Sequence, residues 1–569
     1  PASIQSLILA RMDRLAGADK AALQAASAIG QRFGLDLLRH LIEDPGYDCT
    51  GLIAHYLVRP EGADYLFAHA LIREGAYSSL LKARRRELHA RAAQWFAEAD
   101  PVLHAEHLDR AEDPAAPQAY LEADHAQAES YHYERALKLV ERGLAIATGA
   151  ADQFALTCRK GEMLHDLGSI PESRQAFAEA LDLAQDDSQR CQAWIGLAGC
   201  MRITDEYDEA YAALEKAEAV AGDRGLTREL AQIHYIRGNL HFPLGKIDNC
   251  RVEHELSLKY AREADSPEAE ARALSGVADA EYARGRMITA HDHFRRCIEL
   301  CREYGFGRIE VANISMLGFT RYYHDTIQSA LEDGLVAVEA ARKVGHHRAE
   351  MLGQVMCVHA LAELGELDRA RAHTKEARAL ALRLGAIRFE SQNLAWLARI
   401  VHAEGRGPEA LELLEQALEI GRNTGIAFTG PRILSAIALV TEDPERRRSA
   451  LEEGEAILRS GAVSHNHFWF NRDAIEASLN IGDWESVERY AVALEDFTRP
   501  EPLPWCDFFI ARGRTLAGWG RGRRDAETLA ELRRLREEAE RAGFMTALPA
   551  LEAALGQAES PSSVTLSVN

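Results

Sequence analysis

A period of 40 residues runs through the middle of this chain of 569 residues. Four glycines that each close a helix-like stretch follow one another at that interval: Gly305, Gly345, Gly385 and Gly425. Five alanines repeat at the same interval: Ala290, Ala330, Ala370, Ala410 and Ala450. A fixed period of this size indicates a stacked repeat array, in which each unit packs on its neighbours. Because such arrays act mainly by presenting surfaces, we look for binding before catalysis.

Each unit has the pattern of two amphipathic helices joined by a tight turn. In the unit that begins at Phe154, Gly168 marks the turn, and Ile170, Ser173 and Phe177 lie on one face of the second helix. The same template fits starts near residues 117, 154, 191, 231, 271, 311, 351, 391, 431, 468 and 505. Its turn position is glycine in six units, where left-handed backbone angles have no steric cost: Gly168, Gly245, Gly285, Gly365, Gly405 and Gly482.

We therefore predict an all-α protein with a solenoid of about eleven helical hairpins over residues 117–543, in units of about 37 to 40 residues. A capping helix is expected over 544–559 and a loose tail over 560–569.

The bulk composition excludes several classes of protein. The chain carries 88 Asp and Glu against 66 Lys and Arg, a net charge of −22, which argues against nucleic acid as a partner. It has no uncharged apolar run of about 18 residues, so no membrane span is expected. Nine cysteines without framework spacing indicate reduced thiols and a cytoplasmic protein. Because the chain starts at Pro1 rather than Met, we expect a fragment or a processed protein.

The period is lost in residues 1–116. Short helices are expected over 6–15, 20–29 and 33–42, followed by an edge strand at Tyr65–His69 and one long helix over Ala70–Ala99. This different pattern predicts a separate small domain ahead of the array.

Both parts of the chain resemble known families. The repeats resemble the tetratricopeptide repeat, through Gly161 and Gly168, through Trp194 with Tyr207 and Ala210, and through the segment Gly365–Ala370. The first part resembles the winged-helix region that follows the nucleotide-binding core of STAND-type ATPases, through Leu7–Leu15 and Phe67–Tyr77 with Arg85, Leu88 and His89. In particular, it is similar to large bacterial proteins in which a class III adenylate or guanylate cyclase domain precedes an ATPase module and a repeat tail.

That resemblance implies an ATP-binding core upstream of Pro1 and an intramolecular contact with it. The chain itself has no Gly-x4-Gly-Lys-Ser/Thr phosphate loop, which would need backbone amides, Lys and a hydroxyl together. We therefore expect this chain to bind no ATP or other cofactor, to hold no metal and to have no catalytic residues. Two histidines and two cysteines have helical spacing (His291, His293, Cys297 and Cys301), but Cys297 takes a small core position, as a buried free thiol does.

Four basic residues gather in the expected helix over Ala70–Ala99: Lys82, Arg84, Arg85 and Arg86. One interpretation is a contact with the ATPase domain, and another is contact with DNA phosphates. The third is a solvated helix face whose charges pair with acidic neighbours.

The resemblance to tetratricopeptide arrays implies that the first helix of each unit lines a concave groove through positions 2, 5, 9 and 12. These positions nominate Tyr235, Asn239, Phe242, Asp279, Tyr282, Phe319 and Tyr322. Aromatic rings with polar neighbours suit a partner protein, a peptide or a small effector. The alternative is that the rings pack between adjacent units.

The resemblance thus favours the sensor and interaction region of a cyclase-linked STAND ATPase. One alternative is a fragment of a LuxR-type ATP-dependent transcription activator, in which a DNA-binding helix-turn-helix would follow the repeats. The other is a plain tetratricopeptide scaffold with no link to a nucleotide.

Overall fold

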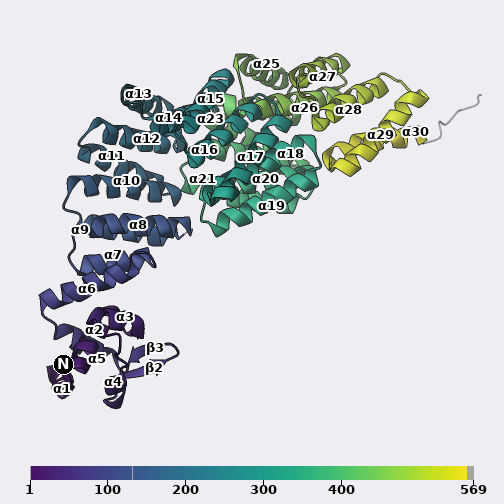
Figure 1. The fold of residues 1–569 in the computed structure, drawn as a ribbon. Coiled ribbons are helices and arrows are strands. Elements are labelled where there is room, and N and C mark those ends of the chain that lie inside the picture. Colours follow the sequence, from purple (N-terminus) through teal and green to yellow (C-terminus); the bar gives the residue numbers. More distant parts are fainter. Residues whose placement is uncertain (1, 131, 560–569) are drawn as a thin grey trace, which may run out of the picture. The chain divides into compact units, whose positions relative to one another are not determined.

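A computed structural model describes residues 2–130 and 132–559, and it is almost entirely helical (Figure 1). The predicted tail over 560–569 lies outside the described residues. The chain divides into two compact units, Pro1–Met163 and Leu164–Asn569, which are described separately. In the described part of the chain, no helix combines the length and the apolar character that crossing a membrane requires.

The first unit begins with six helices and a small sheet: α1 (Ala2–Met12), α2 (Gly17–Ile29), β1 (Arg32–Gly34), α3 (Leu35–Ile42), α4 (Thr50–Ala54), β2 (Val58–Glu61), β3 (Asp64–Phe67), α5 (Ala70–Ser78) and α6 (Lys82–Phe96). The three strands are antiparallel in the order β1-β3-β2. Phe33 and Phe67 bury their rings between this sheet and the helices, beside Leu38 and Leu88. The winged-helix assignment of this region stays a prediction.

Three details of this region differ from the sequence-based expectation. The helix expected over 33–42 begins at Leu35, because Arg32–Gly34 pair with β3 as strand β1. The strand at Tyr65 is central rather than at an edge, because β1 and β2 pair with it from both sides. The expected helix over Ala70–Ala99 is two helices, α5 and α6. The Ser79 hydroxyl donates to the Ala76 carbonyl oxygen at 2.6 Å, and Leu81 is extended, so the chain turns before α6 begins.

Helical hairpins make up the rest of the chain. The first unit continues with α7 (Pro101–Arg110), α8 (Ala116–Glu129), α9 (Tyr133–Ile146) and most of α10 (Ala150–Asp166). The second unit contains α11 (Ile170–Leu183), α12 (Asp187–Ile203), α13 (Tyr207–Arg224), α14 (Thr227–His241), α15 (Ile247–Glu263), α16 (Pro267–Ala283), α17 (Met287–Tyr304), α18 (Gly307–His324), α19 (Ile327–Lys343), α20 (His347–Glu363), α21 (Leu367–Arg383), α22 (Ile387–Ala403), α23 (Gly407–Thr424), α24 (Ile426–Val440), α25 (Pro444–Ser460), α26 (Ser464–Ile481), α27 (Trp484–Thr498), α28 (Pro504–Gly520), α29 (Ala526–Ala542), the 3-10 turn η1 (Met545–Ala547) and α30 (Leu548–Glu559). This is the predicted all-α solenoid.

Glycines with positive φ end the helices at the predicted places. All six predicted turn glycines have φ between 67° and 83°. The four glycines of the 40-residue period also have positive φ, at 78°, 64°, 63° and 117°. In the unit that starts near 191, Asp205 holds the turn position and takes φ 63° without the freedom of glycine. A strained turn of this kind persists only when the surrounding contacts hold it.

The two helices of a hairpin are buried to different extents. α21, a second helix, buries one stripe of Ala370, Thr374, Ala377 and Ala381. α22, a first helix, buries eleven of its 17 residues, including charged and amide side chains. α22 is therefore enclosed on most sides, whereas α21 faces solvent with most of its surface.

This burial arises because the second unit packs on itself across its inner face. Hairpins far apart in sequence make contact: the Trp469 indole N–H donates to the Tyr323 hydroxyl at 3.1 Å. The Glu501 carboxylate accepts from the backbone N–H groups of Ile288 and Thr289, at 2.8 and 3.2 Å, and so caps α17. The inner face of this solenoid is thus partly a hydrophobic core.

Candidate interaction site

The aromatic residues predicted to line an open groove are mostly buried in this core. Tyr282, Phe319 and Tyr322 are 6%, 7% and 1% exposed. Tyr322 packs against Trp469 and Trp505, with ring centroids 6.2 and 6.3 Å away. An open aromatic strip is therefore the wrong description of these three rings, because later hairpins cover them.

Tyr282 and Phe242 sit next to each other at the margin of this core. Their rings stack with centroids 6.2 Å apart, and the Tyr282 hydroxyl hydrogen-bonds Nδ1 of His465 at 3.4 Å. Phe242 is half-buried and also approaches Phe428 at 6.4 Å. The contact of Phe242 with Tyr282 favours the alternative in which the rings pack between adjacent units, and Phe428 and His465 add contacts from hairpins far along the chain.

The remaining predicted positions lie in a polar and more accessible part of the inner face. Tyr235, Asn239 and Asp279 are all half-buried. The Asn239 side-chain amide donates to the Tyr235 carbonyl oxygen at 2.9 Å, which ties Asn239 to its own helix. Tyr235 and Asp279 are thus the predicted residues that this part of the inner face leaves available to a ligand.

Two arginines accompany Asp279 there, and the sequence analysis missed both. Arg202 belongs to α12 and Arg348 to the first turn of α20, and each is half-buried. Burial raises the pKa of Asp279 to about 7, and the positive charges of Arg348 and Arg202 oppose that rise. Burial, together with repulsion from Arg202 and Arg388, lowers the pKa of Arg348 to about 9. The region therefore combines excess positive charge with incomplete hydration.

The pairing of these arginines is incomplete. Within residues 2–130 and 132–559, neither Arg202 nor Arg348 forms an ion pair, and Nη1 of Arg348 is buried without a hydrogen-bond partner. By contrast, Arg388 forms an ion pair with Asp205. The sequence does contain signals for this site. Arg308, Arg348 and Arg388 recur at intervals of 40 residues, and Arg202 lies 40 residues before Phe242, at the same position of its own repeat. We define Arg202, Tyr235, Asp279 and Arg348 as the polar inner site.

Each of the four basic residues at the start of α6 has a partner within the first unit. Lys82 lies 2.8 Å from Glu112, which also pairs with Arg86, and Arg84 lies 2.7 Å from Glu87. The remaining cation, Arg85, donates to the Ser78 carbonyl oxygen at 3.0 Å and covers the Tyr77 ring. These pairs favour the interpretation of a solvated helix face, and a contact with an ATPase domain stays a prediction.

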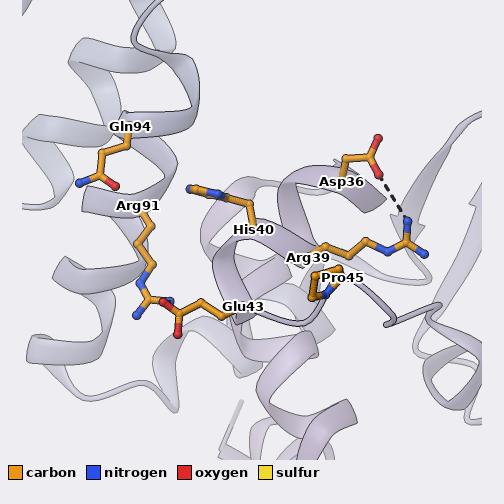
Figure 2. A pocket seen from close by; sticks show the side chains of 7 residues that line it. All are labelled: Asp36, Arg39, His40, Glu43, Pro45, Arg91 and Gln94. Carbon is orange, nitrogen blue, oxygen red and sulfur yellow. Dashed lines mark hydrogen bonds and ion pairs between the residues drawn. The ribbon is translucent and has the colours of Figure 1, made fainter.

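The first unit also has a hollow of about 620 Å³ between α3 and α6 (Figure 2). Its lining is mostly polar: Asp36, Arg39, His40, Glu43, Pro45, Arg91 and Gln94. Arg39 pairs with Asp36 at 3.4 Å and Arg91 with Glu43 at 3.0 Å. Because its charges are paired with one another, this hollow is a weaker candidate than the polar inner site.

Two of the four side chains considered as metal ligands, His291 and Cys297, have other partners. Sγ of Cys297 donates to the Ala271 carbonyl oxygen at 3.1 Å, and Nδ1 of His291 hydrogen-bonds the Thr320 hydroxyl at 3.0 Å. In the described part of the chain, no group of three or more His, Cys, Asp or Glu side chains has a metal-binding arrangement. Cys297 is fully buried beside Leu274, as expected for a core residue.

Comparison with known proteins finds similar solved structures but no matching family. No family model and no curated protein matches the chain. Among solved structures, it is similar to a STAND protein with a tetratricopeptide repeat sensor from Pyrococcus horikoshii, at 14% identity and a TM-score of 0.48. That alignment covers 71% of this chain and 63% of the other, so the chain spans less than two thirds of that protein.

Two further structures share the helical-repeat architecture. A Rap protein complexed with Competence and Sporulation Factor is 15% identical, with 61% of this chain and 98% of that chain covered and a TM-score of 0.48. Yeast Tom70 is 11% identical, with 78% and 96% covered and a TM-score of 0.32. At these values the similarities define no function for this chain. The helical solenoid is established by the helices of this chain and not by these similarities.

Proposed function

We propose that this chain is the sensor and protein-interaction region of a STAND-type signal-transduction ATPase. The polar inner site binds the partner protein, peptide or small effector. The pair Arg202 and Arg348 carries this proposal, because both are half-buried and neither has an ion-pair partner within the described residues. A partly desolvated guanidinium without a carboxylate is costly, and a ligand carboxylate removes that cost.

The composition of the site defines the ligand chemistry. Two guanidinium groups and the Tyr235 ring face one carboxyl group, Asp279, whose pKa of about 7 leaves it partly protonated at neutral pH. The site therefore favours an acidic side chain or a terminal carboxylate next to an aromatic or apolar group. Such selectivity contrasts with the net charge of −22 on the whole chain, which repels acidic ligands elsewhere.

Binding at this place can control an output domain through the contacts across the inner face. Arg348 lies near Arg388, which pairs with Asp205 in a turn 183 residues earlier. A ligand that neutralises Arg348 favours the closed arrangement of these hairpins. It shifts the equilibrium between closed and open forms only by the difference in its affinity for the two.

The binding proposal is tested with labelled peptides and fluorescence anisotropy. One pool of random ten-residue peptides contains Asp and Glu, and a matched pool replaces them with Asn and Gln. We expect the acidic pool to bind more tightly, and Arg348→Gln to weaken that binding at least tenfold. Arg228→Gln is the control, because Arg228 takes the same helix position in α14 but is 62% exposed and pairs with Glu268 at 3.7 Å. Equal binding of both pools, or equal loss in both variants, would contradict the proposal.

The proposed link to an ATPase is based on the resemblance of residues 1–116 to the winged-helix region of STAND-type ATPases. It is tested by reading the coding sequence upstream of Pro1. We expect the coding sequence upstream of Pro1 to contain a phosphate loop and, ahead of it, a class III cyclase domain. In this arrangement the chain contributes binding, and ATP binds only to the upstream core. A coding sequence without a phosphate loop would leave an interaction scaffold with no link to a nucleotide.

A further inference from the structure

Four arginine side chains are buried among the described residues, and one of them differs from the rest. Three have a carboxylate partner: Arg388 pairs with Asp205, Arg472 with Glu363 and Arg512 with Glu476. The fourth, Arg432 of α24, is 2% exposed and pairs with no carboxylate of residues 2–130 or 132–559. Its Nη2 atom is buried without a hydrogen-bond partner.

Asp473, the carboxylate whose charge acts on Arg432, already has another partner. Asp473 forms an ion pair with Arg399, at 3.2 Å for one oxygen, and accepts a hydrogen bond from the Ser435 hydroxyl at 3.0 Å. Asp473 thus neutralises Arg399 and leaves Arg432 uncompensated, which gives a net charge of about +1 in this part of the interior. Burial and repulsion from Arg399 lower the pKa of Arg432 to about 10, so the guanidinium stays charged at neutral pH.

The neighbours of Arg432 add further unsatisfied donors. Its guanidinium lies over the Trp396 ring, 5.7 Å from the centroid, and that ring lies 4.1 Å from the His359 ring. Nε1 of Trp396 and Nε2 of His359 are both buried without a hydrogen-bond partner. Buried polar groups are rarely left unpaired, and here the unpaired groups belong to side chains in mutual contact.

The other polar groups around Arg432 do not neutralise it. His465 faces it from α26, and burial with repulsion from Arg432 lowers the pKa of His465 to about 3, so this ring is neutral. Tyr282 and Tyr323 approach from α16 and α18. The Tyr282 hydroxyl bonds His465, and the Tyr323 hydroxyl accepts from Trp469. The surroundings of Arg432 therefore keep an uncompensated positive charge and provide no carboxylate to its guanidinium.

We propose that a small inorganic anion such as chloride binds at Arg432 as a structural part of the second unit, between α20, α22 and α24. The guanidinium and the Trp396 indole N–H donate to it. The anion neutralises the uncompensated charge and satisfies the unpaired donors, and it thereby joins three hairpins. This site is independent of the polar inner site and of its proposed ligand.

The first test measures unfolding in urea at fixed ionic strength while chloride replaces gluconate, an anion too bulky for the interior. We expect the midpoint for wild type to rise with chloride and to saturate, as a ligand that binds only the folded state requires. Arg432→Met should lose the saturating component and should be at least as stable as wild type without chloride, because it removes an uncompensated buried charge. Arg422→Met, at an exposed arginine paired with Glu453, should respond as wild type does.

A second test does not depend on any variant. Wild-type crystals grown in bromide should show an anomalous scattering peak within hydrogen-bond distance of the Arg432 guanidinium. The absence of a peak there, or a saturating chloride response that persists in Arg432→Met, would overturn the proposal. A wild type without any saturating response would also overturn it.

Discussion

The ion pair between Asp205 and Arg388 gives the sharpest prediction about how the second unit holds together. Both side chains are buried, at 4% and 7% exposed, and the Tyr207 hydroxyl donates to Asp205 at 2.9 Å. Asp205 lies in a turn with φ 63°, at the position where six other repeats have glycine. Asp205→Gly therefore relieves backbone strain and breaks a buried ion pair at once, and the two effects oppose each other.

The magnitudes decide which effect dominates. Replacement of a left-handed aspartate by glycine removes backbone strain and should stabilise the folded state by about 1 kcal/mol. Removal of one partner of a buried pair costs about 3–5 kcal/mol, because Arg388 is left charged and without a carboxylate. We expect a net destabilisation of about 2–4 kcal/mol, which corresponds to a roughly 30- to 700-fold increase in local opening.

Amide hydrogen exchange measures this opening at the affected elements. The start of α22 and the turn before α13 should exchange faster in Asp205→Gly, while α29 serves as an internal reference. Asp205→Asn is the matched variant, because asparagine tolerates the left-handed turn but lacks the charge. Exchange in Asp205→Gly that equals or is slower than that of wild type would refute the reasoning, since backbone strain would then outweigh the ion pair.

Three further predictions concern other parts of the molecule. Tyr322→Ala should destabilise the second unit by about 3–5 kcal/mol in urea, whereas Tyr304→Ala, at a 51% exposed ring, should change the midpoint little; equal effects would contradict the burial. Glu501→Ala should remove the cap of α17 and cost about 1 kcal/mol, seen as roughly fivefold faster exchange at Thr289; unchanged exchange would disprove the cap. Below pH 6.5 the unfolded chain takes up protons at His89 and His107, whose pKa values burial lowers to about 3 and 4 in the folded state. The protection factor of α6, which corrects exchange for the intrinsic effect of pH on amides, should therefore fall between pH 6.5 and 4, and His107→Leu should flatten that profile. A profile that is the same in both proteins would contradict this prediction.

Much of the fold could be predicted because its signals are local. A turn glycine such as Gly365 needs only its own backbone angle, and the 40-residue period needs only neighbouring units to stack. The first unit was harder, because the place of a strand in a sheet depends on partners elsewhere. Tyr65 has the apolar pattern of an edge strand but lies between β1 and β2.

The candidate sites show the same division. Tyr235 and Asp279 were found by their repeat register, whereas Arg202 and Arg348 were missed because arginine on a helix usually indicates a solvated face. Arg432 could not be recognised as unusual from its position. The lack of a carboxylate partner is visible only when all side chains around it are in place.

Spacing and turn residues are enough to predict a solenoid of helical hairpins, since they act within one repeat and its neighbour. That the solenoid packs on itself is evident only from contacts between hairpins far apart in the chain. Contacts such as that of Trp469 with Tyr323 join residues 146 positions apart and leave no periodic trace. That packing buries most of the aromatic rings and leaves Arg202 and Arg348 only half-buried, because covering apolar surface lowers the free energy whereas covering a charge without a partner raises it.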